Sequence, residues 1–444
     1  CLERGGLSRD EVYLTNVVKV RPPNNEIFRL PELGTKIEDF LPQLWKEIEE
    51  INPNCILAFG NTALKALTGY TGIQKYRGSI LTNCRTGLPK VVSSIHPASL
   101  FHETDGKMKS YRDKAFIQFD VNRAIHQSTF REHRAPSRLL HTAKSSLDLI
   151  RFLDRNIGAG KRVIVYDIET FKAIPMCIGF AFSKFEAISV PLFDIMSSTN
   201  PEGISIHDMV FVWRTIADLL LDPQFKLVGH NLKFDQGRLE EIGFHTVWPH
   251  FDSQLGFHTM YPELPKRLAF VSSILTEEPY YKDDLEEYNP KKEVLKKRLI
   301  YNARDCAVEF EVYEKEIAEL EEMGMLDWYF DTQPKLHKFY YNMEKRGILC
   351  DKVVRKRLGE KYDRYTRWID KSLERDLGYS LNVSSPKQVY TTLYGDLGCP
   401  RRRDTAEATL QGLMVNAVKD DRRQRIINNV LKGRKARKTK STYI

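Results

Sequence analysis

Short apolar runs alternate with amphipathic stretches over residues 11–100. Val12–Val20 and Cys55–Phe59 have the pattern of strands, whereas Ile37–Ile51 has apolar residues at helical spacing. A further helix is expected over Asn61–Leu67, after a turn at its amino-terminal end. Strands that alternate with helices predict an α/β domain with a parallel sheet.

A second α/β pattern begins near residue 140. Arg162–Tyr166 is a short apolar run, and Ile178–Phe182 and Ala187–Pro191 are expected to follow it as strands of a meander. Leu227–Gly229 is expected to be a strand that leads into a helix from Leu232. The pattern then predicts a long helix, over Ile300–Leu320.

The carboxyl-terminal quarter is helical in pattern and strongly basic. Residues 328–444 contain 27 Lys and Arg against 13 Asp and Glu, whereas the rest of the chain has 41 against 46. The net charge of +9 therefore comes entirely from this quarter. A concentrated positive charge favours a polyanionic partner, because neutralised phosphates release counterions. A solvated basic surface is the alternative interpretation.

Length and composition fit a multidomain globular protein. The 444 residues predict two to four domains, and 42% hydrophobic with 29% charged residues is a globular composition. No window of eighteen apolar residues predicts a membrane span. The seven cysteines are scattered without a CxxC pair, which indicates reduced thiols and no iron–sulfur cluster. Residues 122–140 are polar, with little periodicity, and are expected to be a linker.

Three short motifs contain candidate metal ligands. In YDIET at 166–170, Asp167 and Glu169 are two apart on a strand, so both side chains point to one side. NLKFD at 231–235 places Asp235 where a helix begins, and YNARD at 301–305 places Tyr301 and Asp305 on one helix face. Carboxylate oxygens suit Mg²⁺ or Mn²⁺, and two such ions can hydrolyse a phosphodiester. Each motif alone is weak evidence, whereas their order and structural setting together indicate a nuclease.

These motifs resemble the DEDD exonucleases whose third motif contains Tyr. The resemblance covers about residues 140–325 and implies a ribonuclease-H-like fold with a mixed sheet. It implies Asp167, Glu169, Asp235 and Asp305 as ligands of two Mg²⁺ or Mn²⁺ ions, and Tyr301 as the group that orients the attacking water. The stretch Tyr261–Lys282 resembles the proofreading domain of family A DNA polymerases.

The basic quarter resembles the thumb of family A DNA polymerases. NVSSPKQ at 382–388 resembles an N-x-S-S-x-K-Q segment, and the end at 431–443 resembles an R…K-x-K-S-T-Y helix that lies along duplex DNA near the primer end. The resemblance implies contacts to DNA from Asn382, Ser384, Ser385, Lys387, Gln388, Arg434, Arg437, Lys438, Lys440, Ser441 and Thr442. Arg434 and Lys438, four apart on a helix, are expected to share one phosphate-facing surface.

Residues 7–105 resemble the uracil-DNA glycosylase superfamily, closest to its family-4 branch. The matching segments include YLTNVVK at 13–19, LAFGNTAL at 57–64 and SIHPAS at 94–99. The resemblance implies a base-binding pocket with Asn16 and His96. The iron–sulfur cysteine of that branch is replaced by Val20, and the opening glycine-rich motif would precede Cys1, so a binding or architectural domain is expected.

Together the patterns predict an α/β multidomain chain from a family A DNA polymerase, similar to replicative enzymes of large bacteriophages. The expected domains are a glycosylase-like domain at 1–121, the linker at 122–140, a 3′–5′ exonuclease domain at 141–327 and a helical thumb at 328–444. The expected partners are primer-template DNA, a single-stranded 3′ end, and a palm-and-fingers portion from the same gene or a separate subunit. No membrane partner is expected, and the location would be the cytoplasm or nucleoid of a bacterial cell.

Three other functions fit parts of the sequence. DEDD nucleases also process RNA 3′ ends, and the glycosylase-like segment is compatible with a uracil-DNA repair protein. A non-catalytic assembly module is the third alternative, against which the complete nuclease motifs argue.

Overall fold

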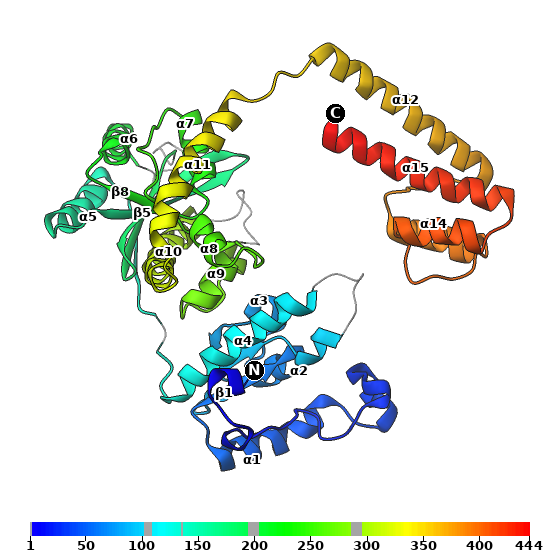
Figure 1. Cartoon of the computed structure of the whole chain (residues 1–444), viewed down its shortest axis with the longest axis horizontal. Coiled ribbons are helices and arrows are strands. Elements are labelled where there is room, and N and C mark those ends of the chain that lie inside the picture. The colour runs from blue at the N-terminus through cyan, green and yellow to red at the C-terminus, as the bar shows by residue number, and fades with distance from the viewer. Residues whose placement is uncertain (1, 102–108, 135, 194–203, 286–294) are drawn as a thin grey trace. The chain divides into compact units, whose positions relative to one another are not determined.

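The computed structural model describes residues 2–101, 109–134, 136–193, 204–285 and 295–444 (Figure 1). It divides into two compact units, Cys1–Lys345 and Arg346–Ile444. Among the described residues, no helix combines the length and the apolar character that crossing a bilayer requires.

The first unit begins with a small three-stranded sheet in the order β1-β3-β2. Strands β1 and β3 are parallel, and β2 is antiparallel to β3. The strands are β1 Cys55–Phe59, β2 Ile80–Leu81 and β3 Lys90–Ser94, with helices α1 Leu41–Ile51, α2 Gly60–Thr68, α3 Ile73–Tyr76 and α4 Lys109–Ser128. Short 3₁₀ helices are η1 Glu3–Gly5, η2 Arg9–Glu11, η3 Pro23–Asn25, η4 Ile27–Leu33, η5 Ile37–Phe40 and η6 Pro97–Phe101.

Most of the amino-terminal predictions are confirmed. The strand at Cys55–Phe59 and the helix over Asn61–Leu67 are present, and Ile37–Ile51 forms η5 followed by α1. The strand predicted at Val12–Val20 is wrong. That segment pairs with no strand in the described part of the chain, and a Thr15 hydrogen bond to Glu47 (Oγ1 to Oε2, 2.7 Å) ties it to α1 instead.

A six-stranded mixed sheet follows in the order β4-β7-β6-β5-β8-β9. β5, β6 and β7 form the predicted antiparallel meander, and β4 with β7, β5 with β8, and β8 with β9 are parallel pairs. The strands are β4 Leu139–Thr142, β5 Val163–Phe171, β6 Ile174–Ser183, β7 Glu186–Pro191, β8 Lys226–Gly229 and β9 Phe251–Asp252.

Helices cover both faces of this sheet, because alternate residues of each buried strand face opposite sides. Ile164 and Tyr166 pack in the core with α5 and α6, whereas Val165 packs in the core that contains Ala303 of α10 (Figure 1). Gly179 of β6 permits α10 to approach, since a Cβ there would lie 2.6 Å from Cys306 Sγ. The helices are α5 Ser146–Gly158, α6 Ile206–Leu221, α7 Leu232–Glu241, α8 Ser253–Met260, α9 Leu268–Leu275, η7 Lys282–Leu285, α10 Leu295–Glu322 and α11 Leu326–Arg346.

Two predicted boundaries need correction. Residues 122–128 of the expected linker form the last turns of α4, and residues 139–140 already belong to β4. Helix α11 belongs to the first unit, so the boundary lies between Lys345 and Arg346 rather than at residue 328. The Tyr329 hydroxyl accepts a hydrogen bond from Asp252 N (2.8 Å) and donates one to Asp252 O (3.1 Å), which fixes the start of α11 against β9.

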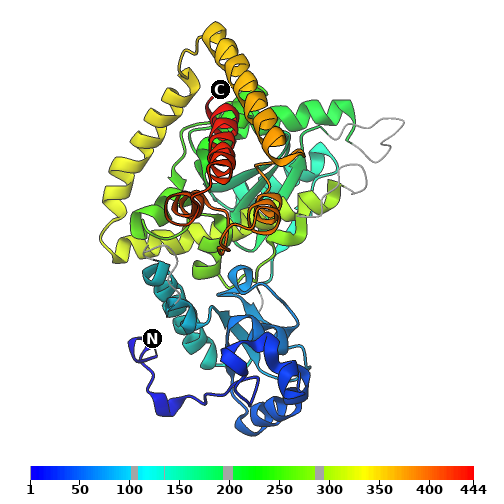
Figure 2. The ribbon, with the colours of Figure 1, turned by 90° about the vertical axis from the view of Figure 1, so that its right-hand side faces the viewer.

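The second unit is helical, as its pattern predicts. Helix α12 lies beside α15 in both views (Figures 1 and 2), and Ile369, Ile427 and Val430 lie in their shared core. The elements are α12 Lys352–Leu377, α13 Pro386–Tyr390, η8 Thr391–Asp396, α14 Glu407–Asn416 and α15 Asp421–Tyr443.

Replacing Tyr329 by Phe should lower the free energy of unfolding of the first unit by about 1–3 kcal/mol, because a buried backbone amide and carbonyl lose their partner. Chemical denaturation measures this. Tyr340→Phe is the matched control, since Tyr340 is exposed on the same helix and should change stability by less than about 0.5 kcal/mol. Equal stability of the two variants would contradict the assignment of α11 to this unit.

Candidate exonuclease site

Three of the predicted carboxylates meet at one point of the mixed sheet. Asp167 and Glu169 lie on β5, and Asp305 lies on α10. Each offers an oxygen within 4.8 Å of the others, and they form the candidate metal-binding group found among the described residues. The alternation of side chains along β5 brings Asp167 and Glu169 to the same side, as the sequence predicts.

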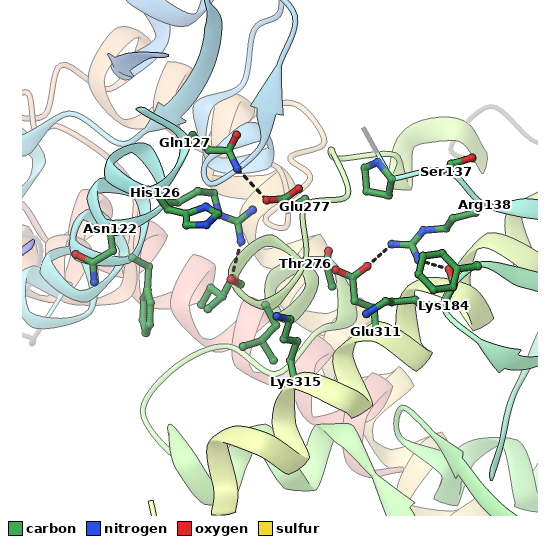
Figure 3. A pocket seen from close by; sticks show the side chains of 16 residues that line it. Asn122, His126, Gln127, Ser137, Arg138, Lys184, Thr276, Glu277, Glu311 and Lys315 are labelled. Carbon is green, nitrogen blue, oxygen red and sulfur yellow. Dashed lines mark hydrogen bonds and ion pairs between the residues drawn. The ribbon is translucent and has the colours of Figure 1, made fainter. Parts of the chain in front are cut away.

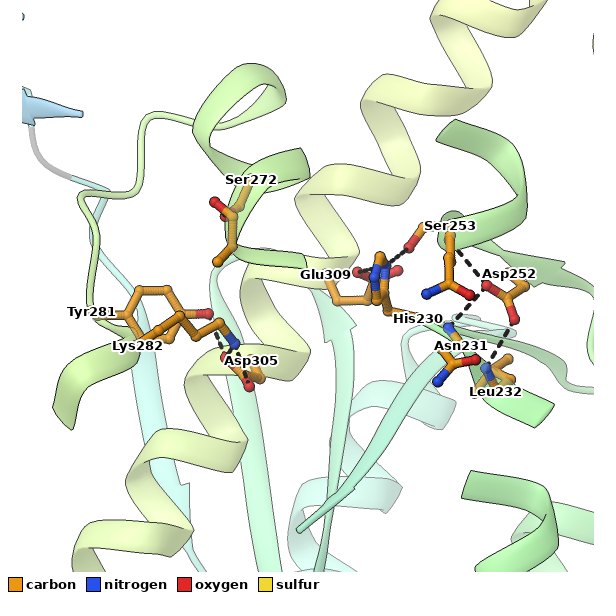
Figure 4. Close-up of polar contacts among 12 residues, drawn as sticks. His230, Asn231, Leu232, Asp252, Ser253, Ser272, Tyr281, Lys282, Asp305 and Glu309 are labelled. Atoms are coloured by element: carbon orange, nitrogen blue, oxygen red, sulfur yellow. Dashed lines mark hydrogen bonds and ion pairs between the residues drawn. The ribbon is translucent and has the colours of Figure 1, made fainter. Parts of the chain in front are cut away.

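The fourth carboxylate, Asp235, lies next to this group but is not one of its three members. Its Oδ1 accepts a hydrogen bond from Ile168 N (3.1 Å), between the two acidic residues of β5. Asp252 helps to position Asp235, because Asp235 lies on α7 and Asp252 holds the start of that helix. The Asp252 carboxylate accepts hydrogen bonds from Asn231 N and Leu232 N (2.9 Å each) (Figure 4). These bonds satisfy backbone donors that a helix start leaves without partners.

Asp305 has a cationic neighbour that the motifs did not identify. Lys282 Nζ donates to both carboxylate oxygens of Asp305 (2.6 and 2.7 Å), and the Tyr281 hydroxyl also donates to Asp305 (Figure 4). The same ammonium lies 4.9 Å from the ring centroid of Tyr301. Tyr281 and Lys282 are the last two residues of the stretch Tyr261–Lys282. The sequence analysis singled out this stretch but assigned no role to either residue.

Asn302 is a second residue that the sequence analysis missed, although it lies inside the third motif. Its Nδ2 donates to Asp167 Oδ2 (2.8 Å) and to Asp167 O (3.1 Å). Its Oδ1 accepts from Ser189 Oγ (2.6 Å), and the side chain is completely buried. The amide therefore fixes the orientation of the Asp167 carboxylate from α10.

The acidic group is electrostatically costly without a cation. Burial, followed by repulsion from Asp235, Asp305 and Glu169, holds the pKa of Asp167 well above its usual range, and Lys282 opposes this. Burial and Asp305 raise the pKa of Glu169 to about 7, against the lowering influence of Arg298 and Lys282. Clustered carboxylate oxygens are the donors that Mg²⁺ and Mn²⁺ prefer, so the residues present fit such an ion.

Tyr301 lies at the edge of the group. Tyr301 lies on α10, one turn before Asp305. Its ring centroid is 5.7 Å from that of Tyr281. Burial, and after it the nearby Asp305 charge, raises the pKa of the Tyr301 phenol. The phenol therefore keeps its proton at neutral pH and is available as a hydrogen-bond donor.

In the second unit, the segment at 382–388 closes on itself. Ser384 N donates to Asn382 Oδ1 (3.0 Å), and Asn382 N donates to Gln388 Oε1 (3.1 Å). Ser385 Oγ accepts from Gln388 N (3.3 Å) and caps α13. Lys387 is exposed. Asn382, Ser385 and Gln388 therefore shape a turn, and DNA contact by this segment stays a prediction.

The basic helix α15 divides into inward and outward residues. Arg434 Nε donates to Val383 O (2.7 Å) and Nη2 to Thr405 Oγ1 (3.2 Å), so its guanidinium joins two loops of the unit. Lys438 is exposed, so the single surface predicted for Arg434 and Lys438 is absent. The remaining predicted residues of this helix are placed as follows: Arg437 pairs with Asp370, Lys440 pairs with Asp363, and Ser441 and Thr442 are exposed.

The two residues predicted for a glycosylase-like pocket, Asn16 and His96, are both exposed. The parallel pairing of β1 with β3 brings two of the motifs together, because Phe59 is the register partner of Ser94. Gly60 lies against His96, where an added Cβ would be 3.2 Å from His96 Cβ, and its φ of +81° suits glycine. The structure does not test base binding.

Comparison with known proteins gives two relationships. The family model of the uracil DNA glycosylase superfamily matches residues 1–120. A type-4 uracil-DNA glycosylase of Thermotoga maritima is 36% identical over 110 residues, which are 24% of this chain and 54% of that protein.

The second relationship extends over most of the chain. DNA polymerase I of Borreliella burgdorferi is 21% identical over 279 residues, 62% of this chain and 30% of the relative. The DNA polymerase of Bacillus phage SP01 is 26% identical over 377 residues, 74% of this chain and 37% of the relative. The chain thus spans about a third of the length of the two polymerases. These similarities relate the chain to the DNA polymerase I-like, family A DNA polymerases, and residues 1–120 form a uracil-DNA glycosylase-like domain.

Proposed function

We propose that the first unit is a divalent-metal-dependent 3′–5′ exonuclease that proofreads DNA within a family A polymerase. The observation that carries the proposal is the convergence of Asp167, Glu169 and Asp305 on one point. Homology to DNA polymerases supports DNA as the substrate. The hydrogen bond from Ile168 N to Asp235, between Asp167 and Glu169 on β5, and the position of Tyr301 one helical turn before Asp305 support the proposal.

The proposed mechanism assigns a separate role to each side chain. Bound Mg²⁺ or Mn²⁺, held by Asp167, Glu169 and Asp305 with Asp235 nearby, would activate water and stabilise the leaving oxygen. Asn302 holds the Asp167 carboxylate in position. The protonated Tyr301 phenol donates a hydrogen bond that orients the attacking water. Lys282 supplies a positive charge beside the site, which favours the approach of a phosphate.

We further propose that the second unit binds DNA through its exposed lysines. Its large excess of Lys and Arg supports this. The proposal places DNA on Lys387 and Lys438, which are exposed, and assigns Arg434 to the fold of the unit. The proofreading and DNA-gripping parts would then act on the same primer strand.

The chain should degrade single-stranded DNA from the 3′ end in Mg²⁺ or Mn²⁺ and be inactive in EDTA. Asp167→Ala should lose several orders of magnitude in rate, because one of the clustered ligands is removed. Tyr301→Phe should lose about a hundredfold, since only the orientation of water is affected. Gel analysis of end-labelled DNA, with labelled RNA in parallel, measures both.

The matched control is Asp218→Ala, which removes an exposed carboxylate on α6 and should leave the rate unchanged. Near-normal activity of Asp167→Ala would refute the site. Preferential degradation of RNA would instead favour an RNA-processing nuclease.

In EDTA, the free energy of unfolding should vary with pH in part because the Glu169 carboxylate gains or loses its proton. Its pKa is about 7 in the folded chain against 4.5 ordinarily, so the folded state binds this proton more tightly. Its contribution to stability is fully present below about 4.5 and is lost as pH rises through about 7. Glu169→Gln should therefore be more stable relative to wild type at pH 8 than at pH 4. Denaturation midpoints measure this, and an identical difference at both pH values would contradict the repulsion.

DNA binding by the second unit should depend steeply on salt. Replacing Lys387 and Lys438 together by Ala should flatten the plot of log K against log salt by about two units, because each phosphate contact contributes about 0.9. Fluorescence anisotropy with duplex DNA measures the slope. Lys335→Ala is the control, since Lys335 is an exposed lysine on α11 of the first unit. An unchanged slope in the double variant would place the DNA elsewhere.

A further inference from the structure

The glycosylase-like domain contacts the segment Ser272–Asp283, which runs from α9 to the candidate exonuclease site. Gly78 lies directly against this segment, because a Cβ there would be 2.6 Å from Ser273 O. Next to it, Arg77 Nη1 donates to Ser273 Oγ (2.9 Å). Arg77 is itself fixed by a completely buried ion pair with Asp120 of α4. The contact is therefore built from buried, mutually satisfied groups.

Helix α4 provides the next contacts along the segment. Arg123 Nη1 donates to Gly78 O (2.9 Å), and its Nη2 donates to Ile274 O (2.6 Å). One guanidinium thus joins the domain to the segment. One turn further on, Gln127 Nε2 donates to Glu277 Oε1 (2.8 Å), beside a pocket of about 490 Å³ (Figure 3). The other wall of this pocket contains Arg138, which is paired with Glu311 of α10.

The last part of the segment is also held by the glycosylase-like domain. Tyr280 N donates to Ser79 Oγ (3.2 Å), and the Tyr280 ring packs edge-on against Tyr76 (centroids 5.5 Å apart). Lys75 Nζ donates to Asp283 Oδ2 (2.9 Å). Tyr280 and Asp283 flank Tyr281 and Lys282 on either side. The two residues that contact Asp305 are therefore bracketed by residues that the other domain holds.

We propose that the glycosylase-like domain is a positioning element for the exonuclease site, and that it sets divalent-cation affinity by holding Lys282 on Asp305 through the segment Ser272–Asp283. The inference deepens the proposed function and rests on it for the identity of the site. It assigns a role to the domain that does not require uracil excision.

The physical basis is competition for one carboxylate. The Lys282 ammonium donates to both oxygens of Asp305, and one of these oxygens belongs to the group that would bind a divalent cation. A cation that binds Asp305 must displace this ammonium. Lys75, Arg123 and Gln127 keep the segment in place, so loosening them frees Lys282 to leave Asp305. They are positioning residues, and their effect should pass entirely through Lys282.

The test measures Mn²⁺ binding to the full 444-residue chain by titration calorimetry, without DNA. Lys282→Met should tighten Mn²⁺ binding by about fivefold or more, which is the lower range of coupling between sites. Lys75→Ala combined with Gln127→Ala, and separately Arg123→Ala, should shift affinity in the same direction. Added to Lys282→Met, they should produce no further shift, because their effect requires the ammonium.

Two controls separate this coupling from other causes. Arg85→Ala changes a cation that lies over Trp45, in the same domain but outside these contacts, and should leave Mn²⁺ affinity unchanged. Asp167→Ala should weaken binding strongly, which places the measured ion at the site. Lys75→Ala with Gln127→Ala removes one half-exposed ion pair and one amide hydrogen bond and leaves the Arg123 contacts intact, so the test remains decisive if Arg123→Ala does not fold.

Unchanged affinity in the Lys75 and Gln127 double variant, or shifts that add to that of Lys282→Met, would overturn the proposal. The outcomes also separate it from the proposed function. Coupled shifts in Mn²⁺ binding without any DNA degradation would sustain the positioning role and remove the exonuclease. DNA degradation with uncoupled Mn²⁺ binding would do the reverse.

Discussion

Mutual repulsion among clustered carboxylates is the constraint around which the first unit is organised. Asp167 and Glu169, which are half-buried, lie close to the buried Asp305, where their ionised forms repel one another, and Asp235 adds a further charge. The surrounding residues offset this in different ways. The Ile168 amide donates to Asp235, Asn302 donates to Asp167, and Lys282 donates to Asp305. A site that neutralises itself only in part is suited to a divalent cation.

The same repulsion suggests a structural role for the glycosylase-like domain, namely to hold the segment beside the acidic site. Its core is continuous with that of the mixed-sheet domain on the α10 side of the sheet, and it contacts the segment that contains Tyr281 and Lys282. A fold related to a base-excising enzyme can thus serve as a support, because function depends on individual sites rather than on the fold. In this proposal the glycosylase-like domain acts on the acidic site through the position of the Lys282 charge.

The sequence predicted the features that depend on local spacing. The strand that carries Asp167 and Glu169, the helix that carries Asp305, and the meander between them follow from periodicity and from the motifs. Apart from the meeting of the motif carboxylates, which the family resemblance implied, it did not predict contacts between distant segments. Val12–Val20 alternates like a strand but pairs with no strand among the described residues, and Arg434 has a basic side chain whose direction depends on Val383 and Thr405. The sequence contains Lys282 and Asn302 but does not show that Lys282 contacts Asp305 and Asn302 contacts Asp167. These contacts depend on the packing of α10 on the sheet.

A crystal structure of the chain soaked with Mn²⁺, with the ion located in an anomalous difference map, tests the central claim most directly. The account predicts Mn²⁺ density bounded by Asp167, Glu169 and Asp305, with the Lys282 ammonium moved away from Asp305. Mn²⁺ density elsewhere in the chain, with Lys282 still paired to Asp305 and the three carboxylates free of metal, would contradict it.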